Sequence, residues 1–159
     1  MNFREITASD LPTLINLTIE TFRPFFEEHL PRLVNPKVLA HDHGAWEAAY
    51  RLEVPALHDP QRSRFVTLAE DQGQVLGYVG WHVTDGTSGR LDMVAVHPDH
   101  QRRGVGTALC RHVLARMTSL GVVVVHIGTG GDDFHVGARR LYESLGFTGL
   151  PVVDYTRAL

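Results

Sequence analysis

Lysine is almost missing from this sequence, since Lys37, which follows Pro36, is the only one. A Walker-type phosphate loop requires Gly-Lys followed by Ser or Thr, so phosphate binding by that route is excluded. The His-Glu-x-x-His pattern of zinc proteases and the Gly-x-Ser-x-Gly pattern of serine hydrolases are also absent. None of these three motifs therefore indicates the function of the protein.

The sequence also has little cysteine, a small net charge and no long apolar run. Cys110 is the only cysteine, which excludes an internal disulfide and favours the reducing cytoplasm. The formal net charge is −3, so neither a nucleic-acid partner nor a membrane partner is expected. No apolar run approaches the ~20 residues of a membrane span, and residues 1–10 have no signal-peptide core. The length fits one domain over residues 1–159.

No metal site is expected either. His41 and His43 flank Asp42, but neighbouring residues rarely point to one site, and no Cys or His follows at a partnering spacing. Cys110 falls within a helical pattern, which favours a buried structural thiol over a nucleophile.

Apolar periodicity predicts an α/β protein with one mixed sheet. Strands are expected over 2–7, 64–71, 74–85, 90–96, 122–127 and 152–159, and helices over 9–22, about 36–51, 104–120 and 137–147. Ser9 is the expected N-cap of the first helix. Gln72 and Gly73 join two β-rich runs, which predicts a hairpin. The apolar run 122–127 is typical of a strand buried on both faces.

The stretch HPDHQRRGVGTAL, residues 97–109, joins the fourth predicted strand to a helix. The first N–H groups of a helix lack intrahelical partners and, with the helix dipole, form an anion site. Gly104 and Gly106 have no Cβ, so a phosphate can approach the backbone, and Arg102 and Arg103 add positive charge. The pattern predicts a diphosphate ligand, although the spacing alone equally fits an ordinary helix that begins at a glycine.

Two stretches resemble the GNAT N-acetyltransferase family. VAVHPDHQRRGVGTAL, residues 94–109, resembles its motif A, Gln/Arg-x-x-Gly-x-Gly/Ala, and ARRLYESLGF, residues 138–147, resembles its Ala-x-x-Leu-Tyr helix followed by Gly-Phe. The predicted order of elements matches the family across nearly the whole chain. The resemblance implies the acyl-CoA N-acyltransferase fold, a single mixed, mostly antiparallel sheet with flanking helices, and acetyl-coenzyme A (acetyl-CoA) as the donor.

The resemblance also implies a set of cofactor-binding residues. The pyrophosphate would sit at motif A, on Gln101, Arg102, Arg103, Gly104, Val105, Gly106 and Thr107. The pantetheine arm would pair with the backbone of Val94, Ala95 and Val96, where one amide polarises the thioester carbonyl. The family often has Asn seven residues before its helical tyrosine. His135 stands there in this chain, and its imidazole either keeps that contact or loses it.

Acetyl transfer to an amine requires a neutral acceptor and an acid for the departing thiolate. The resemblance implies that Tyr142 is this acid, although a helical tyrosine alone fits a core residue. Asp92, Val94 and Val96 share one strand face by the period of two, so Asp92 is the candidate base. A structural partner at a strand edge is the alternative for Asp92. Arg90 would pair with Asp92 or bind an acidic acceptor.

Less is predicted for the remaining polar residues. His82 is a weaker candidate for the cleft, and His126 fits a core histidine. The segment 23–59 is broken by prolines and holds aromatic residues beside glutamates, among them Glu27, Glu28 and Glu47. It either selects a cationic acceptor or packs its aromatic side chains into the core.

We therefore expect an acetyl-CoA-dependent N-acetyltransferase that acts on a primary amine, by direct attack in a ternary complex. A small-molecule acceptor is favoured over a protein. The alternatives are a non-catalytic acyl-CoA-binding module of the same fold and a protein or peptide N-acetyltransferase. Homodimers are common in the family, so a homodimer is an expected assembly.

Overall fold

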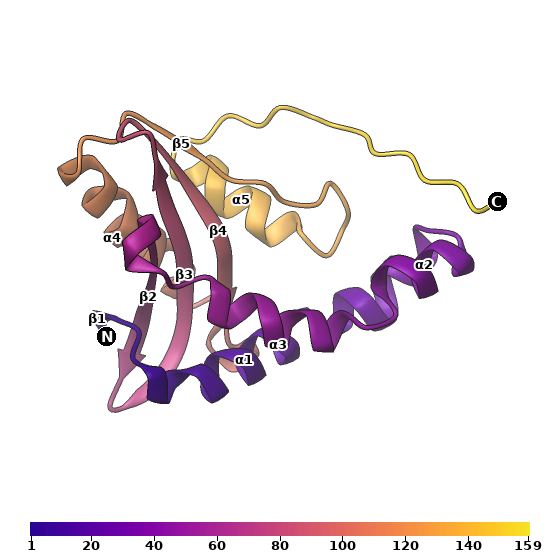
Figure 1. Ribbon diagram of the computed structural model, residues 1–159, viewed down its shortest axis with the longest axis horizontal. Helices are drawn as coiled ribbons and strands as arrows, with labels where there is room; N and C mark the ends of the chain where they lie inside the picture. Colours follow the sequence, from indigo (N-terminus) through magenta and orange to yellow (C-terminus); the bar gives the residue numbers. More distant parts are fainter.

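The computed structural model describes residues 1–159 and contains a five-stranded sheet in the order β1-β2-β3-β4-β5 (Figure 1). The strands are β1 Asn2–Glu5, β2 Arg64–Asp71, β3 Gln74–Thr84, β4 Ser88–Val96 and β5 Val124–His126. The helices are α1 Leu11–Pro24, α2 Pro36–His43, α3 Trp46–Ala56, α4 Val105–Ser119 and α5 Val136–Ser144. Strands β1 to β4 pair antiparallel and β4 pairs parallel with β5. The predicted mixed, mostly antiparallel sheet with flanking helices is confirmed.

Helices cover both faces of the sheet, and each face has its own apolar core. One core joins the sheet to α4 and α5 and includes buried Trp81, Leu109 and Tyr142. The other joins it to α1 and α3 and includes Leu14 and Val54. Because α1 and α5 lie on opposite faces, β4 runs between them. No helix is long and apolar enough to cross a membrane.

The hairpin predicted at Gln72 and Gly73 is confirmed. Both residues have positive φ, 48° and 80°, as the two-residue turns that suit the twist of paired strands require. They connect β2 directly to β3.

Strand β5 is shorter and more exposed than its apolar sequence predicts. It pairs only with Ser88–Arg90 of β4, and the neighbouring Val123 and Val124 are exposed. The expectation of a strand buried on both faces is therefore wrong, because β5 is the edge strand of the sheet. Beyond Arg90, the edge of β4 that faces β5 is unpaired from Leu91 to Val96.

The strand expected over 152–159 is not formed. The chain after α5 has no regular secondary structure from Phe147 onward and extends away from the sheet (yellow in Figure 1). Its apolar side chains, Leu150, Val152, Val153 and Tyr155, are exposed. An alternating pattern forms a strand only where a partner edge is available, and no strand of this chain pairs with this segment.

The helix expected over 36–51 is divided into α2 and α3. The break falls at Gly44 and Ala45, where Ala45 leaves the helical region at φ −114° and ψ 31°. Before α2, the chain continues α1 through a π-helical turn, Phe25–His29, and a 3₁₀ turn, Leu30–Arg32. Such π turns are rare and often occur at functional sites.

The start of α1 differs from the prediction at Ser9. A 3₁₀ turn, Ala8–Asp10, precedes the helix and has Thr7 as its N-cap, and Asp10 rather than Ser9 is the N-cap residue of α1. The N–H and hydroxyl of Thr7 both donate to Oδ2 of Asp10, at 2.8 Å each.

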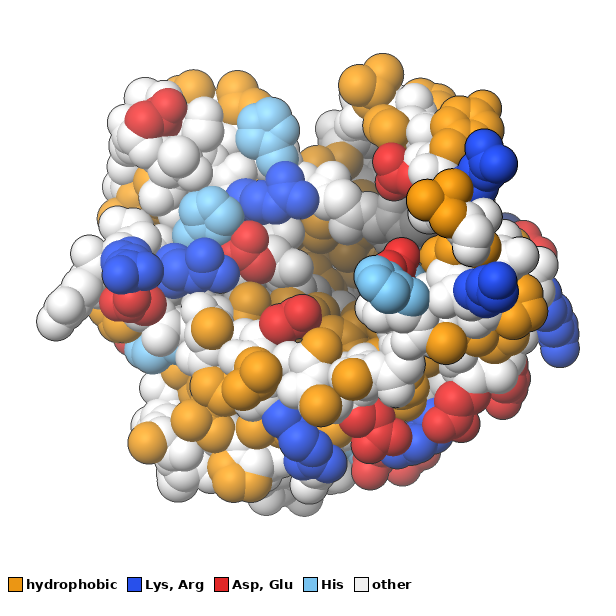
Figure 2. Space-filling model, turned by 45° about the vertical axis from the view of Figure 1, so that its right-hand side comes forward, with side chains coloured by type: hydrophobic (Ala, Val, Ile, Leu, Met, Phe, Trp, Pro, Cys, Tyr) orange, Lys and Arg blue, Asp and Glu red, His pale blue; other side chains and the backbone are white.

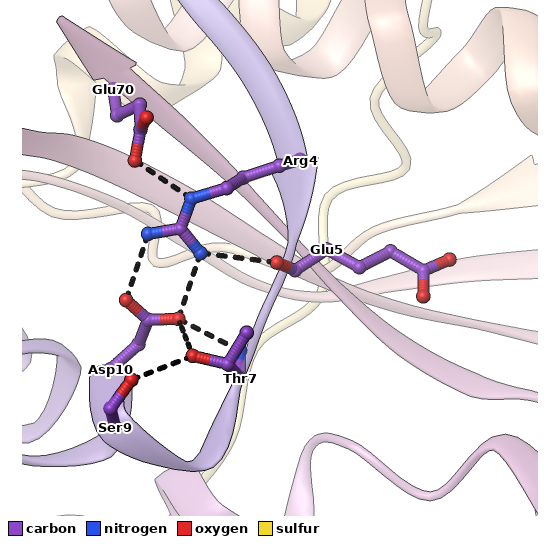
Figure 3. Close-up of polar contacts among 6 residues, drawn as sticks. All are labelled: Arg4, Glu5, Thr7, Ser9, Asp10 and Glu70. Atoms are coloured by element: carbon purple, nitrogen blue, oxygen red, sulfur yellow. Dashed lines mark hydrogen bonds and ion pairs between the residues drawn. The ribbon is translucent and has the colours of Figure 1, made fainter. Parts of the chain in front are cut away.

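Arg4 completes this corner and connects β1, α1 and β2 (Figure 3). Its Nη1 and Nη2 donate to the two oxygens of Asp10 at 2.8 Å, and its Nε donates to Oε2 of Glu70 at 2.7 Å. These hydrogen bonds hold the pKa of the buried Asp10 carboxyl well below its usual value. The corner is a closed ion-pair network that fixes the first strand and helix.

Candidate active site

A pocket of about 540 Å³ opens between α1, the free edge of β4, the loop before α4, and α5. Most of the residues proposed for the cofactor or catalysis line it: Val94, Val96, Gln101, Arg102, Gly104, Val105, Gly106, Thr107, His135 and Tyr142. Ala95, Arg103 and Asp92 are not part of its lining. The space-filling view shows a deep hollow in the molecule, with apolar side chains on its floor and carboxylate, arginine and histidine side chains around its rim (Figure 2).

The loop before α4 presents a series of free backbone donors. No acceptor in the protein lies at the N–H groups of residues 102–107, and the first helical bond runs from Ala108 N–H to Gly104 O at 3.0 Å. Arg102 and Gly104 have positive φ, 61° and 80°, which turns the chain sharply into the helix. Six unpaired N–H groups at the positive end of a 15-residue helix form a strong anion site.

The two motif glycines meet different requirements. Gly104 has open space around the position of a Cβ but needs φ +80°, which side-chain-bearing residues rarely adopt. At Gly106 a Cβ would lie 3.3 Å from Leu141 Cδ2 and 3.6 Å from Val96 Cγ2. Gly106 therefore permits close packing of α4 against α5 and β4.

The end of β4 is held by Gln101 of motif A and by two polar residues of α1, Glu20 and Thr21, that the sequence pattern did not single out. The Val96 carbonyl accepts hydrogen bonds from Thr21 Oγ1 at 3.1 Å and from Gln101 Nε2 at 3.0 Å. Glu20 Oε2 lies 3.2 Å from His97 Nε2. Glu20 and Thr21 also line the pocket. Nothing in a local motif marks them, because only the fold brings the end of α1 to the end of β4.

Tyr142 is 8% exposed and packs against Phe147 at a ring distance of 6.0 Å. Its hydroxyl makes no hydrogen bond within the protein, although the residue lines the pocket. Burial raises the pKa of Tyr142 well above its usual value, so the phenol is protonated at neutral pH. The hydroxyl is thus available as a proton donor. Burial also raises the pKa of the Cys110 thiol to about 12, as expected for a structural cysteine.

His135 is fixed by the glycine-rich loop before α5. Its Nδ1 lies 2.7 Å from Asp132 Oδ2, and Asp132 Oδ1 accepts the N–H of Phe134 at 2.9 Å. Arg139 Nη1 donates to the carbonyls of Gly130 and Asp132 at 2.6 and 2.7 Å. Burial opposes ionisation of Asp132, but the hydrogen bond and charge of His135 lower its pKa overall. The imidazole is therefore held rigidly at the pocket wall.

Asp92 does not share a face with Val94 and Val96. Gly80 pairs with Met93 and Trp81 with Leu91, which leaves Asp92 as the extra residue of a β-bulge. The bulge interrupts the period of two. Val94 and Val96 pack toward α4 and α5, whereas Asp92 contacts His82. The predicted common face is wrong for this reason.

Asp92 lies among basic side chains. Its Oδ2 is 2.6 Å from His82 Nδ1 and 3.9 Å from Arg64 Nη2, and its Oδ1 is 3.9 Å from Arg90 Nε. An ionised carboxylate only accepts, so His82 Nδ1 donates and leaves Nε2 free to accept a proton. His126, expected in the core, is exposed beside Arg90 at the sheet edge.

The segment 23–59 packs its aromatic side chains together. Trp46 stacks on Phe26 with ring centroids 4.7 Å apart. Glu27 and Glu47, two of the carboxylates considered for a cationic acceptor, both accept from Arg23 Nη1, at 2.9 and 3.1 Å. Their charge is thus already shared with an arginine.

Comparisons with known proteins agree with this geometry. The family model described as acetyltransferase (GNAT) family matches residues 12–147. Mycothiol acetyltransferase of Thermobispora bispora is 32% identical over 154 residues, covering 90% of this chain and 50% of that protein. The chain thus spans about half the length of this relative. The ribosomal protein bS18-alanine N-acetyltransferase of Escherichia coli is 30% identical over 113 residues, covering 63% of this chain and 72% of that enzyme.

A solved structure shares the fold. It is a GNAT family acetyltransferase from Brucella melitensis in complex with acetyl-CoA, with a TM-score of 0.64 and 22% identity. The match covers 93% of this chain and 82% of that chain.

Proposed function

This chain belongs to the acetyltransferase (GNAT) family, and from that premise we propose that it transfers the acetyl group of acetyl-CoA to a primary amine of a small molecule. We treat residues 1–159 as one N-acetyltransferase domain. The observation that carries the proposal is the set of six unpaired N–H groups of residues 102–107, all of which except Arg103 line a 540 Å³ pocket that also holds Tyr142. The free N–H groups suit the diphosphate of the donor, and the part of the pocket beside Tyr142 suits its thioester.

The donor is expected to follow the free edge of β4. Its pyrophosphate would accept from the N–H groups of residues 102–107, with Arg102 and Arg103 adding charge. The pantetheine arm would lie along the unpaired backbone near Val94, Ala95 and Val96. His135 would contact the arm or the acceptor from the opposite wall.

The reaction would proceed by direct attack in a ternary complex. The amine nitrogen bonds to the thioester carbon, the carbon–sulfur bond breaks, and the thiolate takes the proton of the Tyr142 hydroxyl. Because His82 pairs with Arg90 rather than with Val94, its Nε2 would receive the amine's proton through a chain of water and pass it on to solvent, with Asp92 positioning the imidazole through Nδ1. The products are an N-acetylated amine and coenzyme A, and solvent returns the proton to Tyr142.

A peptide amine is the second candidate acceptor. The bacterial relative that acetylates ribosomal protein bS18 at alanine supports it, whereas the mycothiol acetyltransferase relative supports a small molecule. A non-catalytic acyl-CoA-binding module would keep the donor site without acetyl transfer.

We include a homodimer and a cytoplasmic location in the proposal. The exposed apolar residues Leu150, Val152 and Tyr155 and the open edge of β5 offer surface to a second copy. The single buried thiol of Cys110 suits a reducing compartment. Light scattering after gel filtration tests the dimer, and a monomer at micromolar concentration would contradict it.

The decisive assay measures coenzyme A release with a thiol-reactive dye, over a panel of small primary amines and short peptides. The proposal predicts release above the rate of hydrolysis with at least one small amine, and an acetylated product by mass spectrometry. If acetyl-CoA binds tightly but no amine accelerates thiol release, the binding-module alternative replaces the proposal. Faster release with peptides only would favour the second candidate.

A further inference from the structure

Four basic side chains form a row across the sheet. Strand pairing places Arg64 of β2 opposite His82 of β3, His82 opposite Arg90 of β4, and Arg90 beside His126 of β5. Paired residues of neighbouring strands share a face, and this face is the one covered farther along by α1 and α3. The basic row, Arg64, His82, Arg90 and His126, therefore lies where that cover ends.

The basic row has more donors than the protein satisfies. Asp92, 14% exposed, is the carboxylate that lies within 4 Å of both arginine side chains, but each arginine stays 3.9 Å away, beyond hydrogen-bond reach. Arg64 Nε is buried without a partner. The Arg90 side chain is 50% exposed. Buried donors left without acceptors are unfavourable, so a ligand that brings a further acceptor to the basic row would be favoured.

The basic row also lies near the side of the pocket from which we expect the amine acceptor to enter. Asp92 is two residues from Val94, which lines the pocket. Arg90 Nη2 lies 3.5 Å from the position that a Cβ on Gly128 would take, and Gly128 belongs to the loop that leads to His135. A molecule bound at the basic row would reach the pocket across the free edge of β4.

We propose that the acceptor carries a carboxylate as well as its primary amine, and that Arg64 and Arg90 bind this carboxylate. The inference rests on the proposed acetyl transfer and specifies its substrate class. Guanidinium groups pair with carboxylates through two parallel hydrogen bonds. Arg90 pairs with His82 and Val94 with Val79, so the two positions are three steps apart along β3, about 10 Å at ~3.3 Å per residue. The amine and the carboxylate are therefore several bonds apart, as in an ω-amino acid or a short peptide.

Direct binding tests the inference without turnover. Calorimetry on the protein saturated with coenzyme A would compare N-acetyl-ε-aminocaproate with its neutral amide. We expect the acid to bind at least about tenfold more tightly, and Arg90→Gln to abolish the difference. Arg116→Gln, an exposed arginine of α4, is the matched control and should preserve it. Equal affinities of acid and amide for the wild-type protein would overturn the inference.

Turnover separates this inference from the proposed function. Among β-alanine, γ-aminobutyrate and ε-aminocaproate, we expect kcat/KM to rise with chain length and to exceed that of each matching amide. Arg90→Gln should raise KM for the acids about tenfold and leave KM for acetyl-CoA unchanged. Equal turnover of acids and amides would overturn the carboxylate site and leave acetyl transfer intact. A preference for the acid in binding, with no amine turned over, would support the site and contradict acetyl transfer alone.

Discussion

The N-terminal corner around Arg4 and Asp10 and the basic row both place arginines beside an aspartate. The hydrogen bonds of the arginine are satisfied in the corner but not in the row. Arg4 donates from all three of its nitrogens at 2.7–2.8 Å, to Asp10 and Glu70. Arg64 and Arg90 each stop 3.9 Å from Asp92. A satisfied guanidinium stabilises the elements that it joins, whereas an unsatisfied one is available to a ligand. The corner is therefore structural, and the row is a candidate binding surface.

The starts of α1 and α4 differ in the same way, because their backbone N–H groups are hydrogen-bonded at α1 and free at α4. At α1, Thr7 and Asp10 exchange hydrogen bonds that satisfy their own N–H groups. At α4, the N–H groups of residues 102–107 have no partner in the protein. Substitutions in the satisfied region should change stability and leave activity intact, whereas those in the unsatisfied region should change activity or donor binding.

The largest effect is expected at Tyr142. Tyr142→Phe keeps the ring and removes the proton donor, so kcat should fall about 10²-fold or more, while affinity for acetyl-CoA stays nearly constant. Steady-state kinetics and calorimetry measure the two quantities. A variant that turns over at the wild-type rate would make Tyr142 a packing residue only.

Asp10→Asn tests the satisfied corner. Removing the charge leaves Arg4 half-paired, and because Arg4 is partly exposed we expect a loss of about 2 kcal/mol in the free energy of unfolding. Since the folded-state pKa of Asp10 is lowered, its contribution is present above the unfolded pKa, about 3.9, and is lost as pH falls through the folded value. The stabilities of the variant and the wild type should therefore begin to converge as pH falls below about 4 and become equal only below the lowered folded-state pKa. Urea unfolding at several pH values measures this, and a pH-independent difference would contradict it.

Asp92→Asn tests the opposite region. The amide no longer fixes His82 with Nε2 free, so kcat/KM at neutral pH should fall about tenfold. Activity should recover at high pH, where more of the amine is neutral without help. His82→Gln should cause a similar loss, and the double variant should lose little more, because the two residues act as a unit. Independent, multiplying losses would show that Asp92 and His82 do not act together.

The smallest effect is expected at Gly104, which we compare with Gly86 because both glycines have a positive φ. Gly104 and Gly86 have φ of 80° and 82°, and neither has an atom within 4 Å of a Cβ. Alanine at either position should lower the free energy of unfolding by about 1 kcal/mol. Only Gly104→Ala should also weaken acetyl-CoA binding, by a few-fold, because it tilts the free N–H groups. Equal affinity in both variants would separate Gly104 from the donor site.

The features of the fold that depend on a few neighbouring residues can be predicted from the sequence. The hairpin at Gln72–Gly73 and the strand-to-helix turn at Gly104 depend on backbone preferences that a few residues determine. The bulge at Asp92 could not be predicted, because the extra residue is defined only by pairing with β3. The row of Arg64, His82 and Arg90 was missed for the same reason, since strand register brings it together.

The C-terminal half of the sheet shows the other limit of sequence patterns. The apolar run 122–127 predicts an interior strand, but the place of a strand in the sheet depends on its neighbours, and β5 has β4 on one side only. The alternation in 152–159 likewise forms no strand. The division of 36–51 into α2 and α3 falls at Gly44 and Ala45, and α3 then begins with Trp46 stacked on Phe26, a contact that helical periodicity does not report.

The central claim is that the free N–H groups before α4 hold the donor's diphosphate, and amide NMR on the isotope-labelled protein tests it most directly. On saturation with acetyl-CoA, we expect the amide protons of residues 102–107 to shift downfield and to exchange more slowly with solvent, since each gains an acceptor or loses access to water. The amides of Thr7 and Asp10, already bonded within the corner, should not change. Unchanged resonances for residues 102–107 in a protein that still binds acetyl-CoA would contradict the account.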